Sequence, residues 1–180
     1  MNYIGEVQKA VDAALEQRAA IGKSLDELNA RYKDQRIGGA DYAEQKAQLA
    51  ARQEANRLFA AAEIMRIEKE HAADVDRAFS AVDAAQLDPD AQLLELKNFK
   101  PTPEQFAALA EKHRGNRLMS QILAEYQSQH PDLNGEYIPS AEGEKQRFSD
   151  YAAAARQTVA NPDSLQAAFF LNGEYTPKDE

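Results

Sequence analysis

The chain has 180 residues, a formal net charge of -9 and no cysteine. Its length suits one domain, or one domain with an extension. The absence of cysteine excludes disulfides and thiolate metal sites. The acidic balance argues against binding to nucleic acid or to anionic membrane surfaces, because both need a basic face.

Strong helix formers, chiefly Ala, Glu, Gln, Lys, Arg and Leu, dominate the composition. We therefore predict an all-α fold, with a long antiparallel, coiled-coil-like helical hairpin followed by a small bundle of short helices. The longest apolar runs are too short to span a bilayer, and no basic segment followed by an apolar run opens the sequence. We expect a cytoplasmic protein.

The first segment carries a heptad pattern. Apolar residues alternate at spacings of three and four over about four heptads, with an interruption at Arg18. Such a pattern predicts a helix that packs lengthwise on another helix. The apolar positions are Ile4, Val7, Val11, Ala14, Ile21, Leu25, Leu28 and Tyr32.

The paired glycines Gly38 and Gly39 predict a turn near 37–41. Asp41, three residues before Glu44, then resembles a capping box and starts a second helix that reaches about residue 86. A short turn between two long helices makes them antiparallel. Residues 1–87 are thus predicted to form the hairpin.

Residues 88–180 are predicted to form a small helical domain with a polar, acidic tail. Asp88-Pro89, Thr102-Pro103 and Asn161-Pro162 are typical helix starts. Bulkier apolar residues than those of the hairpin are expected to build a separate core here: Phe106, Leu118, Ile122, Leu123, Phe148 and Tyr151.

Residues 133–139 and 171–177 share the sequence Leu-Asn-Gly-Glu-Tyr-x-Pro. The Asn-Gly pair can supply the positive φ of a helix C-cap, which makes the repeat a helix-exit device. A duplicated helical unit, or two short segments that pair as a ribbon, are the alternatives. The sequence alone does not decide between them.

Glu68-x-x-His71 matches one half of a di-iron carboxylate site in a helix bundle. Neither His113 nor His130 has a glutamate three positions before it, so the second half is missing. We therefore predict no metal site and no cofactor.

A locally basic zone surrounds Arg114 and Arg117. Cations near a helix C-terminus explain it without a ligand. The specific role that we favour for it is a pairing with the acidic region 131–180. The sequence contains no glycine-rich phosphate loop and no nucleophile elbow, and we expect a protein that is not an enzyme.

Across residues 1–87, the long Ala/Glu/Gln-rich helices resemble the acidic helical accessory proteins of bacterial and prophage assembly systems, including phage scaffolding proteins. The resemblance implies a non-enzymatic interaction or assembly protein. Scaffolding proteins typically carry a basic C-terminal hairpin that binds the coat protein, whereas residues 131–180 of this chain are acidic.

Beyond about Met65 the second helix is expected to outrun the first, so its apolar residues need another cover. We predict protein partners, with self-association through the hairpin. The alternative is a small adaptor or regulator that binds a protein partner through its C-terminal domain. The predicted partner or oligomer surface consists of Ile64, His71, Val75, Val82, Arg114 and Arg117.

Overall fold

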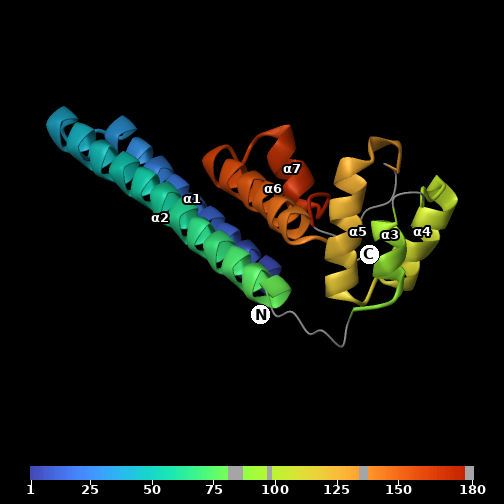
Figure 1. The fold of residues 1–180 in the computed structure, drawn as a ribbon. Helices are drawn as coiled ribbons and strands as arrows, with labels where there is room; N and C mark the ends of the chain where they lie inside the picture. Colours follow the sequence, from blue (N-terminus) through green and yellow to red (C-terminus); the bar gives the residue numbers. More distant parts are fainter. Residues whose placement is uncertain (81–86, 97–98, 134–137, 177–180) are drawn as a thin grey trace. The chain divides into compact units, whose positions relative to one another are not determined.

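The computed structural model describes residues 1–80, 87–96, 99–133 and 138–176. The described residues are 80% helical, and no strand occurs among them, which confirms the predicted all-α fold (Figure 1). None of the helices within them has the length and apolar character needed to cross a membrane. The elements are α1 (Tyr3–Lys33), α2 (Gly39–Ser80), α3 (Asp90–Glu95), α4 (Pro103–Lys112), α5 (Arg117–Gln129), the 3-10 turn η2 (Pro131–Leu133), α6 (Ala141–Ala160) and α7 (Leu165–Leu171).

Helices α1 and α2 pack together as the predicted hairpin. The heptad seam of α1 supplies buried side chains at Val7, Val11, Ala14 and Leu28. The Asn56 side-chain amide donates to the Ala14 carbonyl oxygen at 2.8 Å and so joins the two helices. Near the turn, the rings of Tyr32 and Tyr42 stack with their centroids 4.4 Å apart. These contacts fix the register of the hairpin.

The chain reverses over residues 34–38, slightly before the predicted turn at 37–41. The Arg36 N–H donates to the Arg31 carbonyl at 2.9 Å, across the left-handed residue Gln35 with φ 59°. This is the Schellman arrangement, in which glycine is the usual left-handed residue.

The paired glycines therefore do not supply the left-handed cap that the sequence suggested. Gly39 is the first residue of α2, and the Gly38 carbonyl accepts from the Tyr42 N–H at 3.0 Å. The glycine pair permits the helix to start, while Gln35 ends the preceding one.

Helix α6 completes the hairpin core. Tyr151 is 2% exposed, and Phe148 meets Tyr3 edge-on with ring centroids 6.1 Å apart. Helix α7 adds Phe170, whose ring centroid lies 5.2 Å from that of Tyr151. The buried residues of this core are Val7, Val11, Ala14, Ala60, Ile64, Ile67, Phe148, Tyr151, Ala152, Ala154, Ala155, Val159 and Phe170.

A second core lies among the shorter helices and is formed by Leu94, Phe106, Ala110, Leu123, Leu133 and Ile138. The predicted start of α4 is confirmed, because Thr102 and Gln105 form a reciprocal capping box. At the start of α7 the structure differs from the sequence expectation, since Ser164 accepts from the Ala167 N–H.

The chain forms two compact units, residues 1–70 with 148–180 and residues 71–147. Phe148 and Tyr151 thus belong to the hairpin core. The sequence predicts them in the core around Phe106, and that prediction is wrong. The apolar face of α6 packs with the apolar faces of α1 and α2 in one core. The predicted division into domains 1–87 and 88–180 stays a prediction about independent folding.

The second copy of the repeated segment ends a helix as predicted. Gly173 has φ 80°, and the Glu174 N–H donates to the Phe169 carbonyl at 3.1 Å, which forms a Schellman cap. In the first copy, Gly135 lies outside the described residues. The helix-exit interpretation therefore holds for the end of α7.

Replacing Gln35 with glycine should raise the free energy of unfolding by about 1 kcal/mol, because the left-handed conformation is strained for a residue with a Cβ. Gly173→Ala is the matched reverse change and should lower it by about 1 kcal/mol. Urea unfolding followed by circular dichroism measures both. A loss of stability in Gln35→Gly would contradict the assigned cap.

Burial raises the pKa of Tyr151 from 10.0 to about 12. Since the folded-state pKa lies above the unfolded one, this contribution to stability is complete below pH 10.0 and is lost as the pH rises through about 12. The wild type should therefore lose more stability than Tyr151→Phe between neutral and strongly alkaline pH. Parallel pH profiles of the urea midpoint in the two proteins would refute this origin.

Candidate functional site

The predicted partner surface is divided by the structure. Ile64 is fully buried in the hairpin core and Val75 is 5% exposed, so neither side chain forms an outer surface of a single chain. His71 is half-buried, and Val82 lies outside the described residues. Ile64 is covered from within the chain, because it lies in one core with residues of α1, α6 and α7.

The Glu68 carboxylate is engaged in structural contacts. It accepts from the Ser149 hydroxyl at 2.6 Å and pairs with the Arg156 guanidinium. Both carboxylate oxygens are thus bonded to α6. This pairing joins α2 to α6 and gives Glu68 a role other than the metal ligand that its spacing from His71 suggests.

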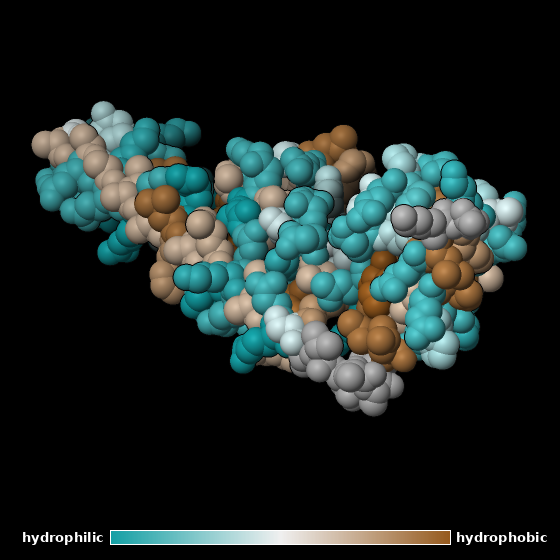
Figure 2. Space-filling model, viewed as in Figure 1, coloured by the Kyte–Doolittle hydropathy of each residue, from teal (hydrophilic) through white to brown (hydrophobic). Residues whose placement is uncertain are grey.

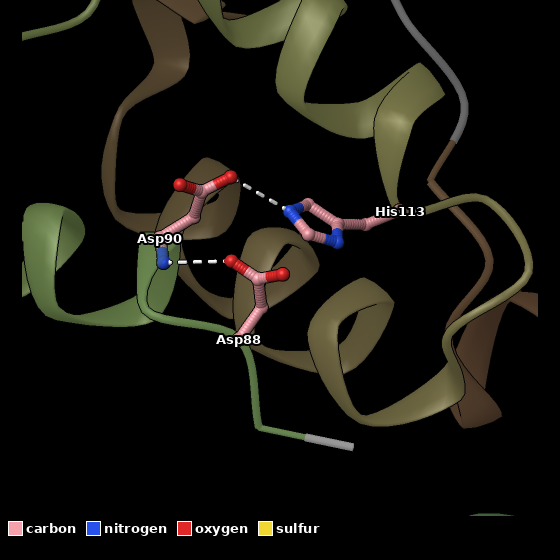
Figure 3. A group of neighbouring side chains, drawn as sticks. All are labelled: Asp88, Asp90 and His113. Atoms are coloured by element: carbon pink, nitrogen blue, oxygen red, sulfur yellow. Dashed lines mark hydrogen bonds and ion pairs between the residues drawn. The ribbon is translucent and has the colours of Figure 1, made fainter.

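A polar cluster joins the start of α3 to the end of α4 (Figure 3). The ligand atoms of Asp88, Asp90 and His113 lie within 4.8 Å of one another. His113 Nε2 is 2.9 Å from Asp90 Oδ2, and Asp88 Oδ1 accepts from the Asp90 N–H at 3.0 Å. The imidazole is buried, with 4% of His113 exposed.

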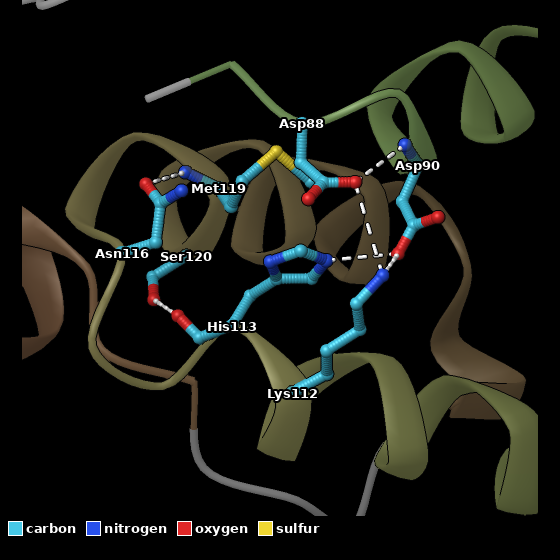
Figure 4. Close-up of polar contacts among 7 residues, drawn as sticks. All are labelled: Asp88, Asp90, Lys112, His113, Asn116, Met119 and Ser120. Atoms are coloured by element: carbon cyan, nitrogen blue, oxygen red, sulfur yellow. Dashed lines mark hydrogen bonds and ion pairs between the residues drawn. The ribbon is translucent and has the colours of Figure 1, made fainter. Parts of the chain in front are cut away.

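Lys112 supplies the cation of this cluster (Figure 4). Its Nζ lies 2.6 Å from Asp90 Oδ2 and 3.8 Å from Asp88 Oδ1. The ammonium and the imidazole of His113 converge on the same carboxylate oxygen. A divalent ion at this carboxylate would have to compete with an ammonium that the chain itself provides. The donor set is therefore better described as a clamp between α3 and α4 than as a metal centre.

The backbone around His113 holds the imidazole in place. The His113 carbonyl accepts from the Ser120 hydroxyl at 3.3 Å and from the Asn116 N–H at 2.8 Å. Asn116 in turn caps α5 by accepting from the Met119 N–H at 3.2 Å (Figure 4). Sequence reasoning missed the cluster because Asp90 and His113 are far apart in the chain, and no spacing rule connects them.

Arg114 and Arg117 line one pocket of about 510 Å³ in the unit 71–147. The pocket is lined by Ala78, Arg114, Gly115, Arg117, Ser120, Pro139 and Glu144. Glu144 belongs to the acidic region 131–180, so the pocket brings the locally basic zone and that region together. No spacing rule in the sequence identifies Glu144 as their neighbour.

An exposed apolar strip follows α2 on the side opposite the hairpin core. We call Ala51, Ala55, Leu58, Phe59, Ala62 and Met65 the outer strip. Leu58 is 54% exposed, Phe59 75% and Met65 59%. Brown and tan surface interrupts the hydrophilic surface along the hairpin in Figure 2.

The helical repeat explains why these side chains are not in the core. Leu58 and Ile67 are nine residues apart, about two and a half turns, so they point to opposite sides of α2. Ile67 is 1% exposed and lies in the hairpin core. The alanines and Leu58 and Met65 recur at spacings of four and three, the pattern of a coiled-coil seam.

A groove of about 480 Å³ borders the outer strip between α1 and α2. Its lining includes Ala20 and Ile21 of α1 with Ala55 and Phe59 of α2. The strip and the groove together form a continuous apolar area on the hairpin. Such areas on protein surfaces commonly mark interaction sites.

Comparison of the chain with models of known protein families, with curated proteins and with solved structures finds no match.

The pKa of the Asp90 carboxyl lies below its ordinary value of 3.8, first because Lys112 and then because His113 donates a hydrogen bond to it. A folded-state pKa below the unfolded value gives stability that is present above about pH 4 and is lost as the pH falls through the folded pKa. Asp90→Asn should therefore be less stable than the wild type at pH 7, and the difference should shrink in acid. Thermal unfolding across this pH range measures the difference in stability. Asp26→Asn, a change at an exposed residue of α1, is the control. An unchanged difference at low pH would contradict the clamp.

Proposed function

We propose that this chain is a non-enzymatic interaction protein that assembles with a second copy of itself through the outer strip. The observation that carries the proposal is the exposed heptad seam on the outside of α2. Leu58, Phe59 and Met65 together present a large apolar area that no part of the described chain covers. The resemblance to assembly proteins supports the same class, and the lack of cysteine fits a cytoplasmic location.

Side-chain size supports an antiparallel pairing. The seam alternates small residues at Ala55 and Ala62 with larger ones at Leu58 and Met65. In an antiparallel pair with two-fold symmetry, Leu58 of one copy can face Ala55 of the other, and the reverse contact follows from the symmetry. The large Leu58 side chain then fits against the small Ala55 of the other copy, as close packing requires.

The charges at the two ends of the seam support the same register. Continued with heptad spacing, the seam reaches exposed Glu44 at one end and exposed Lys69 at the other. In this antiparallel register each Lys69 faces the partner copy's Glu44, and Arg52 lies near the partner copy's Phe59, where a cation–π contact is available. A parallel pair would instead place Lys69 against Lys69 and Glu44 against Glu44, which is unfavourable.

Sedimentation equilibrium at micromolar concentration should show a dimer in reversible equilibrium with monomer. Leu58→Glu should weaken the dimer by roughly 100-fold, since a charge buried in an apolar seam is costly. Leu165→Glu is the matched control, because Leu165 is 72% exposed on α7 and lies outside the strip. This control should leave the association unchanged.

A charge exchange tests the register itself. Lys69→Glu should weaken the dimer several-fold, and the double variant Glu44→Lys/Lys69→Glu should restore it, because opposite charges then face each other again. A wild-type protein that stays monomeric at all concentrations would refute the proposal and favour the adaptor hypothesis. A dimer that is insensitive to Leu58→Glu would place the interface elsewhere.

A further inference from the structure

The arginine pocket, defined by the lining residues given above, carries opposite charges on its walls. Arg114 and Arg117 lie around the turn between α4 and α5, and Glu144 lies in the first turn of α6. All of them belong to the unit 71–147. The pocket is independent of the outer strip, which lies in the other unit.

The two guanidinium groups are positioned differently. Arg117 lies over the ring of Phe79, with its Cζ 5.8 Å from the ring centroid. This cation–π contact helps to hold the guanidinium group of Arg117 in position. Arg114 reaches Glu111 at 3.0 Å, in a pair whose side chains are about half exposed. Exposed pairs of this kind contribute little free energy, so the Arg114–Glu111 pair adds little to the stability of the fold.

Glu144 faces the pocket with a partly buried carboxylate. Its pKa is raised by burial, while the charges of Arg117 and Arg147 act in the opposite direction. The carboxylate of Glu144 and the guanidinium of Arg117 thus influence each other electrostatically.

We propose that the arginine pocket binds a small zwitterion, with the anionic group of the ligand on Arg114 and Arg117 and its ammonium group on Glu144. A guanidinium presents paired N–H donors that match a carboxylate, and a carboxylate accepts readily from an ammonium. A purely anionic ligand would be attracted by the arginines but repelled by Glu144. A ligand with both charges satisfies both walls.

The size of the pocket suits such a ligand. Its volume of about 510 Å³ lies within the range of small-molecule sites in proteins. Ser120 adds a hydroxyl to the lining, and Gly115 leaves open space beside the arginines, since a Cβ built there meets nothing within 4 Å. An amino acid or another compact molecule with separated charges is the class of ligand that these features favour.

The test uses the full chain and a matched set of probes followed by NMR and calorimetry. The zwitterions are glycine, 4-aminobutanoate and 6-aminohexanoate, and the singly charged partners are hexanoate and hexylamine. At least one zwitterion should shift the resonances of residues that line the pocket and should bind roughly tenfold more tightly than either singly charged probe. Arg117→Gln should remove the preference over hexylamine, and Glu144→Gln should remove the preference over hexanoate.

Arg57→Gln, a change on α2 in the other unit, is the control and should leave the affinities unchanged. Circular dichroism checks that each variant is folded. Three results would overturn the proposal: no saturable binding of any zwitterion, affinities that do not respond to the pocket variants, or hexanoate binding that equals zwitterion binding and tightens in Glu144→Gln. The last result would identify a simple anion site.

Discussion

The structure depends on covering the apolar side chains of one long helix. Helix α2 spans Gly39–Ser80, and a helix of that length is held in water by packing more than by propensity. Its inner face is covered by α1 along the seam of Val7 and Val11, and α6 adds Tyr151 to the same core. Its outer face, with Leu58 at its centre, is left exposed. The fold and the proposed assembly are two consequences of the same requirement.

Much of the fold follows from local chemistry that a single sequence displays. The seam from Ile4 to Tyr32 and the capping box at Thr102 identify helices because periodicity and capping are local properties. The partner of an apolar face is not a local property. The apolar faces of α6 and α5 have similar character in sequence, so the sequence predicts the wrong core for Phe148 and Tyr151.

The candidate sites show the same limit. Arg114 and Arg117 were identified because they lie close together in sequence, whereas Glu144 and Phe79 reach them only through the tertiary fold. The clamp at Asp90 escaped notice for the same reason. The predicted position of the hairpin turn is wrong for a different reason. The left-handed residue of the cap after helix α1 is Gln35, although glutamine does not favour that conformation. The glycine pair predicts a turn at 37–41, but the hydrogen bond from the Arg36 N–H to the Arg31 carbonyl ends the helix before the glycines.

The antiparallel pairing of α2 through its outer strip is tested most directly by distances between spin labels. The chain has no cysteine, so a single label can be placed at Ala43→Cys or at Arg57→Cys, which occupy the same heptad position two repeats apart. The antiparallel register predicts a short distance between the two copies at residue 57 and a separation of about 40 Å at residue 43, because each helical residue adds 1.5 Å. Equally short distances at both positions, or no distance between copies, would contradict the account.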